Sequence, residues 1–202
     1  GYQVGGSARK QKDSSAFLGL PHTRDSDALG FVVDASQLPR FERSTLLHTR
    51  DPEIYRAPLL LIRESIPVDP WEPRASRADE DLMFHASYRG ISFADSIDGA
   101  MWCRYIQLVI QSSLLPFSML MLDGRFGVER EAVHQEALER MPVVPLNRLS
   151  GSSRQRLQSL SDQLTGSMTA ELAAAIDEFV FDSLELTRND RQAIGDLLET
   201  GT

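Results

Sequence analysis

The chain has 202 residues, 42% of them hydrophobic, so it is long enough to bury a core in one domain or in one domain with a smaller appendage. Its formal net charge of -8 at pH 7 argues against a free-standing protein that coats nucleic acid, but it leaves room for a local basic face. Arginine makes up 19 of the 21 basic residues and suits fixed contacts to phosphate or base edges, although a coding bias toward arginine explains the same count.

The N-terminal half of the chain predicts a polar lead-in followed by a small sheet. Residues 1–28 are rich in Ser, Gly, Asp and Arg, a composition typical of a linker. Residues 57–63, APLLLIR, form an unbroken apolar run, which predicts a central strand buried on both faces. Shorter strands are predicted at residues 30–34, 82–86 and 91–93, with a tight turn at residues 88–90.

The longest apolar stretch, residues 100–122, predicts a buried helix, because its large apolar residues recur at spacings of three and four. Pro116 is expected to kink or end this helix. Polar residues such as Arg104 interrupt the stretch too often for a membrane span. The single cysteine, Cys103, lies in the same stretch, so we expect a buried thiol, no disulfide within the chain and a reducing, cytoplasmic location.

The C-terminal part of the chain predicts short amphipathic helices. One is predicted at residues 128–141, and three more follow a Ser- and Gly-rich boundary near residue 150. The last helix is expected to begin with a capping box that runs from Thr187 to Asp190. The sequence thus predicts an α+β fold, in which a small mixed β-sheet packs on a buried apolar helix and a C-terminal helical subdomain follows. The expected divisions are residues 1–28, 29–150 and 151–202.

No motif of a known catalytic or metal site is present in the sequence. There is no glycine-rich phosphate loop after a strand, no G-x-S-x-G elbow and no pair of cysteines for zinc. Glu131 and His134 share a helical face, but a carboxylate-bridged di-iron site needs two such motifs and two more glutamates. His85 on a strand is more simply a core or rim residue than a catalyst. We therefore predict no catalytic residue and no metal site in this chain.

Several stretches occur in an order that resembles the C-terminal part of adenine-N6-specific DNA methylases from restriction-modification and related phage-defence systems. Those methylases carry a Y-x-x-P-x-L-L-I-R strand, a Y-L-x-x-L-L-N-S helix, a glycine loop and an exit with the pattern P-(I/V)-P-x-L. The matching stretches are residues 54–63 (IYRAPLLLIR), 86–90 (ASYRG), 105–114 (YIQLVIQSSL), 124–130 (GRFGVER), 141–146 (MPVVPL) and 175–187. The resemblance covers about residues 50–200, with Gln111-Ser112-Ser113 where Asn-Ser is usual.

The resemblance implies a non-catalytic DNA target-recognition module of a larger S-adenosylmethionine-dependent adenine-N6 DNA methyltransferase or restriction-modification enzyme. The (D/N)-P-P-(Y/F/W) tetrapeptide that holds the extruded adenine is absent, as is the cofactor-binding glycine loop. We therefore expect no methyl transfer and no cofactor in this chain, with S-adenosylmethionine bound by a catalytic domain elsewhere in the parent protein. The expected partners are double-stranded DNA and that catalytic domain, without a membrane.

Residues on predicted loops are the candidates for DNA contacts, because arginine pairs with guanine edges and with phosphates. The candidates are Arg74, Arg77, Ser87, Tyr88, Arg89, Arg125 and Arg130. Arg74 and Arg77 belong to a proline-rich loop expected at residues 65–79. A simpler interpretation is that these arginines are solvated charges that pair with nearby acids. The alternative function is a protein–protein docking module of the same kind of system, with no direct DNA contact.

Overall fold

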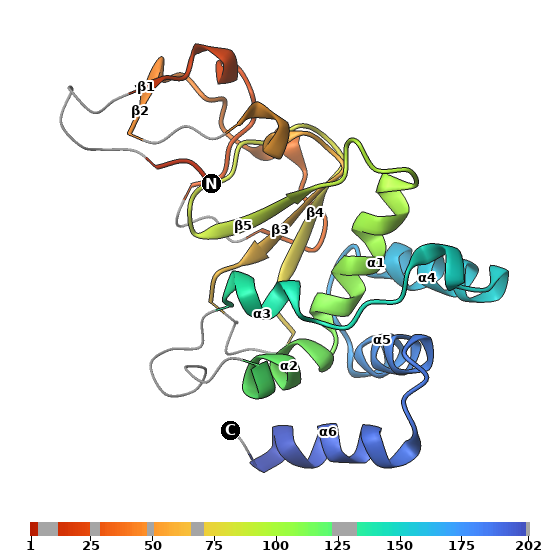
Figure 1. The fold of residues 1–202 in the computed structure, drawn as a ribbon. Helices are drawn as coiled ribbons and strands as arrows, with labels where there is room; N and C mark the ends of the chain where they lie inside the picture. Colours follow the sequence, from red (N-terminus) through yellow and green to blue (C-terminus); the bar gives the residue numbers. More distant parts are fainter. Residues whose placement is uncertain (4–11, 25–28, 48–50, 66–70, 123–132, 201–202) are drawn as a thin grey trace. The chain divides into compact units, whose positions relative to one another are not determined.

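The computed structural model describes residues 1–3, 12–24, 29–47, 51–65, 71–122 and 133–200, and it confirms the α+β class (Figure 1). The chain divides into two compact units. Unit 1 comprises Gly1–Arg63 and Ala75–Cys103, and unit 2 comprises Glu64–Arg74 and Arg104–Thr202. The units therefore separate inside the helix that begins at Gly99, whereas the expected boundary near residue 150 coincides with the start of another helix.

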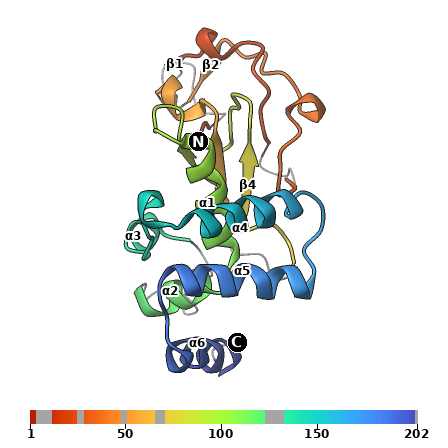
Figure 2. The ribbon, with the colours of Figure 1, turned by 90° about the vertical axis from the view of Figure 1, so that its right-hand side faces the viewer.

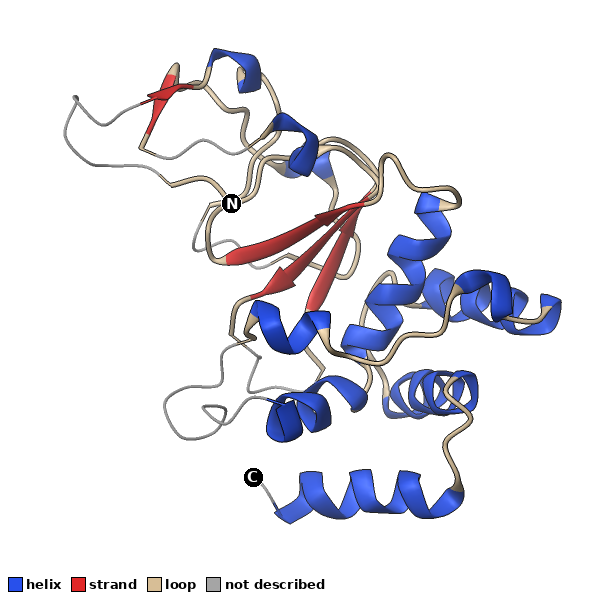
Figure 3. Ribbon diagram, in the orientation of Figure 1, coloured by secondary structure: helices blue, strands red, loops and turns tan. Residues whose placement is uncertain are grey.

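Unit 1 holds all the described strands (Figure 3). They are β1 (Lys12–Asp13), β2 (Thr45–Leu46), β3 (Leu59–Arg63), β4 (Ala75–Ala78) and β5 (Tyr88–Ser92), and three 3-10 helices accompany them: η2 (Ser15–Phe17), η3 (Ala35–Gln37) and η4 (Pro52–Tyr55). Strand β1 pairs with β2, and the larger sheet has the order β4-β3-β5 with antiparallel pairs. Beside this sheet, Val32 forms an isolated parallel bridge with Arg77 of β4.

Strand β3 is the centre of the larger sheet. Leu59, Leu60, Leu61 and Ile62 are each 0% exposed, which confirms the prediction of a strand buried on both faces. The predicted turn at residues 88–90 is wrong, because these residues lie inside β5 and the chain turns at Ala86 and Ser87 instead. Gly90 is required there by close packing: a Cβ atom on Gly90 would lie 2.2 Å from Cζ of Phe84.

The core of unit 1 is rich in aromatic rings. Phe17 contacts Tyr55 edge-on with ring centroids 5.3 Å apart, and Tyr55 contacts Phe84 in the same way at 5.1 Å. These rings pack with Leu59 and Leu61 of β3 in one buried cluster. Tyr2 belongs to the same cluster, so the expected polar lead-in supplies two aromatic side chains, Tyr2 and Phe17, to the core.

The long apolar stretch forms two helices, α1 (Gly99–Gln111) and α2 (Leu114–Leu122), with a bend of 70° between them. The predicted break at Pro116 is wrong, because the helix ends five residues earlier and Pro116 lies in the first turn of α2. In that turn a backbone N–H needs no partner within the helix, so proline is tolerated. None of the described helices is by itself long and apolar enough to cross a membrane, whereas the bent pair α1 and α2 together has sufficient length and composition.

Unit 2 is helical after α2 (Figure 2). Its further elements are α3 (Gln135–Glu139), η5 (Leu146–Arg148), α4 (Gly151–Gln163), α5 (Ala170–Ser183) and α6 (Arg188–Thr200). Helix α4 packs against α5, and α6 packs against α2. The apolar stripes predicted for α4 and α5 are buried, with Leu157 and Ile176 each 0% exposed. Residues 128–132 of the helix predicted at 128–141 lie outside the described residues, and the rest contains only the short α3.

Backbone hydrogen bonds define both ends of the connection between α5 and α6. Leu186 N donates to Phe181 O at 3.0 Å and Glu185 N to Asp182 O at 3.0 Å, with Glu185 at φ 54, which is a Schellman motif. Thr187 N then donates to Asp190 Oδ2 at 2.8 Å, and Asp190 N donates back to Thr187 Oγ1 at 3.3 Å. The capping box predicted for the last helix is thereby confirmed.

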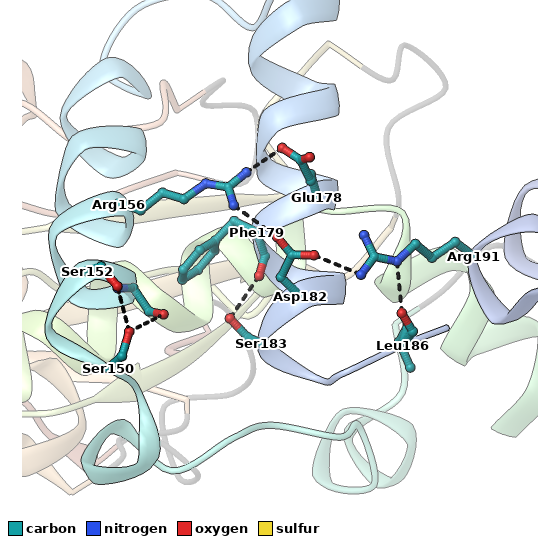
Figure 4. A network of polar contacts seen from close by, with 10 residues as sticks. Ser150, Ser152, Arg156, Glu178, Phe179, Asp182, Ser183, Leu186 and Arg191 are labelled. Atoms are coloured by element: carbon teal, nitrogen blue, oxygen red, sulfur yellow. Dashed lines mark hydrogen bonds and ion pairs between the residues drawn. The ribbon is translucent and has the colours of Figure 1, made fainter. Parts of the chain in front are cut away.

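Asp182 connects the three C-terminal helices (Figure 4). Its carboxylate accepts from Arg191 Nη2 at 2.8 Å and from Arg156 Nη1 at 3.0 Å. Arg156 also donates to Glu178 at 2.6 Å. The hydrogen bond from Arg191 is the largest cause that lowers the pKa of Asp182, so this contribution to stability is present at neutral pH and is lost as the pH falls through the lowered value.

Two glycine-to-alanine substitutions should change stability in opposite directions. Gly90→Ala should destabilise the protein by about 1–3 kcal/mol, because the new methyl group would displace the buried Phe84 ring. Gly195→Ala should stabilise it by about 0.5–1 kcal/mol, because Gly195 lies inside α6 with no atom within 4 Å of the added Cβ. Thermal unfolding followed by circular dichroism measures both. A Gly90→Ala variant as stable as the parent would contradict the packing described for β5.

Candidate functional site

Arg74, the first of the predicted DNA contacts, binds carbonyl groups at the C-terminal end of α1. Its Nη1 donates to the carbonyl oxygens of Gln111 at 3.0 Å and Ser112 at 2.8 Å. The side chain of Gln111 in turn accepts from Arg74 N at 3.0 Å. Burial lowers the pKa of the Arg74 guanidinium. Cations stabilise the C-terminus of a helix, where carbonyl groups lack partners, so this arrangement caps α1.

Asp177 of α5 accepts hydrogen bonds from the residue that precedes α2, on the other side of the break between α1 and α2. Ser113 donates to the Asp177 carboxylate from its backbone N at 2.8 Å and from its Oγ at 2.5 Å, immediately before α2 begins. Burial raises the pKa of Asp177, so the folded protein holds this proton more tightly than the unfolded chain does. Protonation of Asp177 as the pH falls through its raised pKa therefore contributes to stability, and this contribution is lost as the pH rises.

The other predicted contacts lie in unit 1 or outside the described residues. Arg77 on β4 is 4% exposed, with its Nε 3.4 Å from Asp79 Oδ1. Tyr88 is also 4% exposed, whereas Arg89 beside it on β5 is partly exposed. Arg77 and Arg89 belong to the two strands that flank β3, so they are not adjacent. Ser87 lies at the turn before β5, and Arg125 and Arg130 lie outside the described residues.

A cleft in unit 1 brings together arginines and histidines that are far apart in the sequence. It has a volume of about 550 Å³ and is lined by Tyr2, His22, Arg24, Pro39, Arg40, Phe41, Glu42, Arg43 and His85. Three arginines against one glutamate make this surface positive, in a chain whose net charge is -8. The volume lies within the range of about 300–1,000 Å³ that small-molecule sites occupy.

Backbone hydrogen bonds between four extended segments shape the cleft. His22 N donates to Pro39 O at 3.0 Å, Thr23 N donates to Met83 O at 2.9 Å, and Tyr2 N donates to Phe84 O at 3.0 Å. These bonds place the segments around residues 40, 22, 84 and 2 next to one another as a set of single bridges. The sheet-like pairing explains why the lining residues come from separate parts of the chain.

The rings at the base of the cleft surround Tyr2. The centroid of Tyr2 lies 6.1 Å from that of His22, 5.7 Å from that of His85 and 5.8 Å from that of Phe41, all edge-on. The phenol donates to Thr23 O at 2.6 Å, so its polar end is satisfied inside the protein. Tyr2 and Phe41 are buried, whereas both imidazoles are partly exposed and form the accessible part of the base.

The two imidazoles hold their protons on different nitrogens when neutral. His22 Nδ1 lies 3.0 Å from Pro39 O, which can only accept, so Nδ1 carries the proton. His85 Nδ1 accepts from the backbone N of Ser87 at 3.2 Å, so its proton is on Nε2. We assign these tautomers from the partners of each ring. The predicted residue Ser87 thus orients a side chain of the cleft.

Exposed arginines form the rim of the cleft. The backbone around Arg43 is held by Ser14, whose Oγ donates to Arg43 O at 2.7 Å, and the guanidinium of Arg40 lies 3.5 Å from Gly19 O. Guanidinium groups bind phosphate and carboxylate through paired, charge-assisted hydrogen bonds. Within the described residues, no group of three or more His, Cys, Asp or Glu side chains could hold a metal ion. Anion binding is therefore the chemistry that this arrangement supports best.

The sequence does not predict this cleft. His85 was expected on a core or rim position, and the cleft lies next to Ser87, but the other lining residues belong to the expected lead-in or to segments without a strong pattern. One local signal existed: both His22-Thr23-Arg24 and Arg40-Phe41-Glu42-Arg43 combine a ring with arginine. That signal becomes informative only when the two segments are known to pair.

Comparisons of the chain with protein-family models, with curated proteins and with solved structures find no match.

Replacement of Asp177 should separate its role as a cap from the effect of its charge. Asp177→Ala leaves the backbone N–H of Ser113 without its acceptor and should cost about 1–2 kcal/mol. Asp177→Asn keeps an acceptor oxygen and removes the buried charge, so it should cost less and should lack the contribution to stability that protonation of Asp177 is expected to make in the parent on acidification. Chemical denaturation at two pH values measures both. Equal losses in the two variants would contradict the capping role.

Proposed function

We propose that this chain is a non-catalytic DNA target-recognition module of a larger S-adenosylmethionine-dependent adenine-N6 DNA methyltransferase or restriction-modification enzyme. The observation that carries the proposal is the positive, ring-lined cleft of unit 1 in a chain that is otherwise acidic. The order of motifs that resembles the C-terminal part of adenine-N6 methylases supports the class of enzyme.

The cleft supplies the phosphate contacts in this proposal. Arg24, Arg40 and Arg43 are exposed at its rim, where their guanidinium groups reach solvent. Each phosphate neutralised by an arginine releases condensed counterions, which contributes to affinity. Phosphate contacts position a protein on DNA, whereas base contacts specify the sequence. Arg89 on β5 remains a candidate for base contacts, as do Arg125 and Arg130.

The alternative proposal is a docking module that contacts another protein of the same system. The observation that favours it is a set of exposed apolar side chains, among them Ile97 before α1, which is 91% exposed. Docking through apolar surface depends weakly on salt, whereas DNA binding weakens steeply as salt rises. Salt dependence therefore distinguishes the two functions.

The chain should bind short duplex DNA with an affinity that falls as salt is raised from about 50 to 200 mM. The double variant Arg40→Gln/Arg43→Gln should bind more weakly and reduce the slope of log affinity against log salt by about 2, because two phosphate contacts are lost. Fluorescence anisotropy of a labelled duplex gives both quantities. Arg188→Gln is the matched control, since Arg188 is exposed on α6 and lies outside the cleft. Binding that does not depend on salt, or an unchanged slope in the double variant, would contradict the proposal.

The chain alone should neither bind S-adenosylmethionine nor methylate DNA, because the sequence contains neither the cofactor-binding glycine loop nor the tetrapeptide that holds adenine. Calorimetric titration with S-adenosylmethionine tests the first expectation and a methyl-transfer assay tests the second. Saturable cofactor binding would show that methyl-transfer machinery is present in this chain.

A further inference from the structure

The cleft of unit 1 has the dimensions of a site for one small ligand. Its volume is about 550 Å³, and its lining residues come from four extended segments of the same unit. An intact duplex is usually read by a protein element that enters its groove, such as a helix or a β-ribbon. A hollow surface instead takes a group that protrudes from the nucleic acid. We infer that the cleft binds a single unpaired nucleotide of a DNA strand, an inference that rests on the proposed function for the nature of the partner.

The distribution of charge and rings in the cleft matches the two halves of a nucleotide. Arg40 and Arg43 lie at the exposed rim, where a backbone phosphate remains in contact with solvent. His22 and His85 form the accessible part of the base of the cleft, and the buried rings of Tyr2 and Phe41 lie against them. Nucleobases stack on aromatic side chains, and every base offers a face for this contact.

Glu42 gives the cleft a feature that a site for a simple anion would not contain. Glu42 is one of the residues that line the cleft, and a carboxylate repels a phosphate placed beside it. A carboxylate accepts hydrogen bonds from the exocyclic amino group of a base, as Glu and Asp do with cytosine. The mixture of guanidinium, carboxylate and imidazole groups therefore favours a nucleotide over inorganic phosphate.

The position of Tyr2 makes the site rigid. Tyr2 bonds to Thr23 O through its phenol and to Phe84 O through its backbone N, so it fixes the separation of the segments that carry the imidazoles. A site held by buried contacts loses little conformational freedom when a ligand binds. The base of the cleft is therefore preorganised before a ligand binds.

The inference can be tested with two DNA duplexes of the same sequence, one fully paired and one with a single unpaired adenosine. The full chain should bind the second duplex about tenfold more tightly in a fluorescence anisotropy titration, because one unpaired base can stack in the cleft. The Arg40→Gln/Arg43→Gln variant should bind both duplexes more weakly, and His22→Asn should reduce the preference for the unpaired adenosine. Arg188→Gln should leave both affinities and the preference unchanged, and thermal unfolding checks that the variants fold.

Each further outcome decides between this inference and the proposed function. Equal binding of the two duplexes, with affinity that still depends on Arg40 and Arg43, overturns the inference and leaves the proposed function in place. No binding of either duplex at low salt overturns the proposed function as well. Saturation by free 2′-deoxyadenosine 5′-monophosphate without a preference for the unpaired duplex identifies a site for free nucleotides and overturns the inference. Inorganic phosphate that competes as well as this nucleotide also overturns it.

Discussion

The packing of Tyr2 is the constraint on which the candidate site depends. Its backbone N pairs with Phe84 O, its phenol holds Thr23 O, and its ring contacts both imidazoles of the cleft. One buried side chain thus connects the first residues of the chain to segments about 20 and 80 positions further along. Aromatic side chains bury a large apolar surface while they satisfy one polar group, which makes tyrosine suited to this position. The shape of the cleft therefore follows from a contact made by the chain's N-terminal segment.

Arginine has two separate uses in this protein. Arg74 and Arg77 are engaged inside their units, the first as a cap for α1 and the second in a nearly buried position beside Asp79. Arg40 and Arg43 are exposed around a concave surface. A guanidinium group suits both uses because it stays charged and donates several hydrogen bonds in one plane. Composition alone does not separate the two, so the count of arginines overstated the number available for a partner.

Features with a local cause could be predicted from the sequence, and features with a distant cause could not. The apolar run of β3, the stripes of α4 and α5 and the capping box of α6 each depend on neighbouring residues. The turn predicted at Gly90 is wrong because the glycine is required by contact with the Phe84 ring, which the local turn pattern does not reveal. The predicted helix break is wrong because the cap at the actual break, Asp177, is distant in sequence. The cleft is an extreme case, since its lining comes from segments that pair only in the folded protein.

The connection between α5 and α6 has a practical consequence. Leu184, Glu185, Leu186 and Thr187 each use their backbone N–H in a specific hydrogen bond, and Arg191 holds Leu186 O at 3.0 Å. Because every backbone N–H of this connection has a partner, inserting residues into it would break several of these hydrogen bonds at once. Epitope tags, fluorophores or fused domains placed at this corner would distort both helices, so labels belong at other surface positions of the chain.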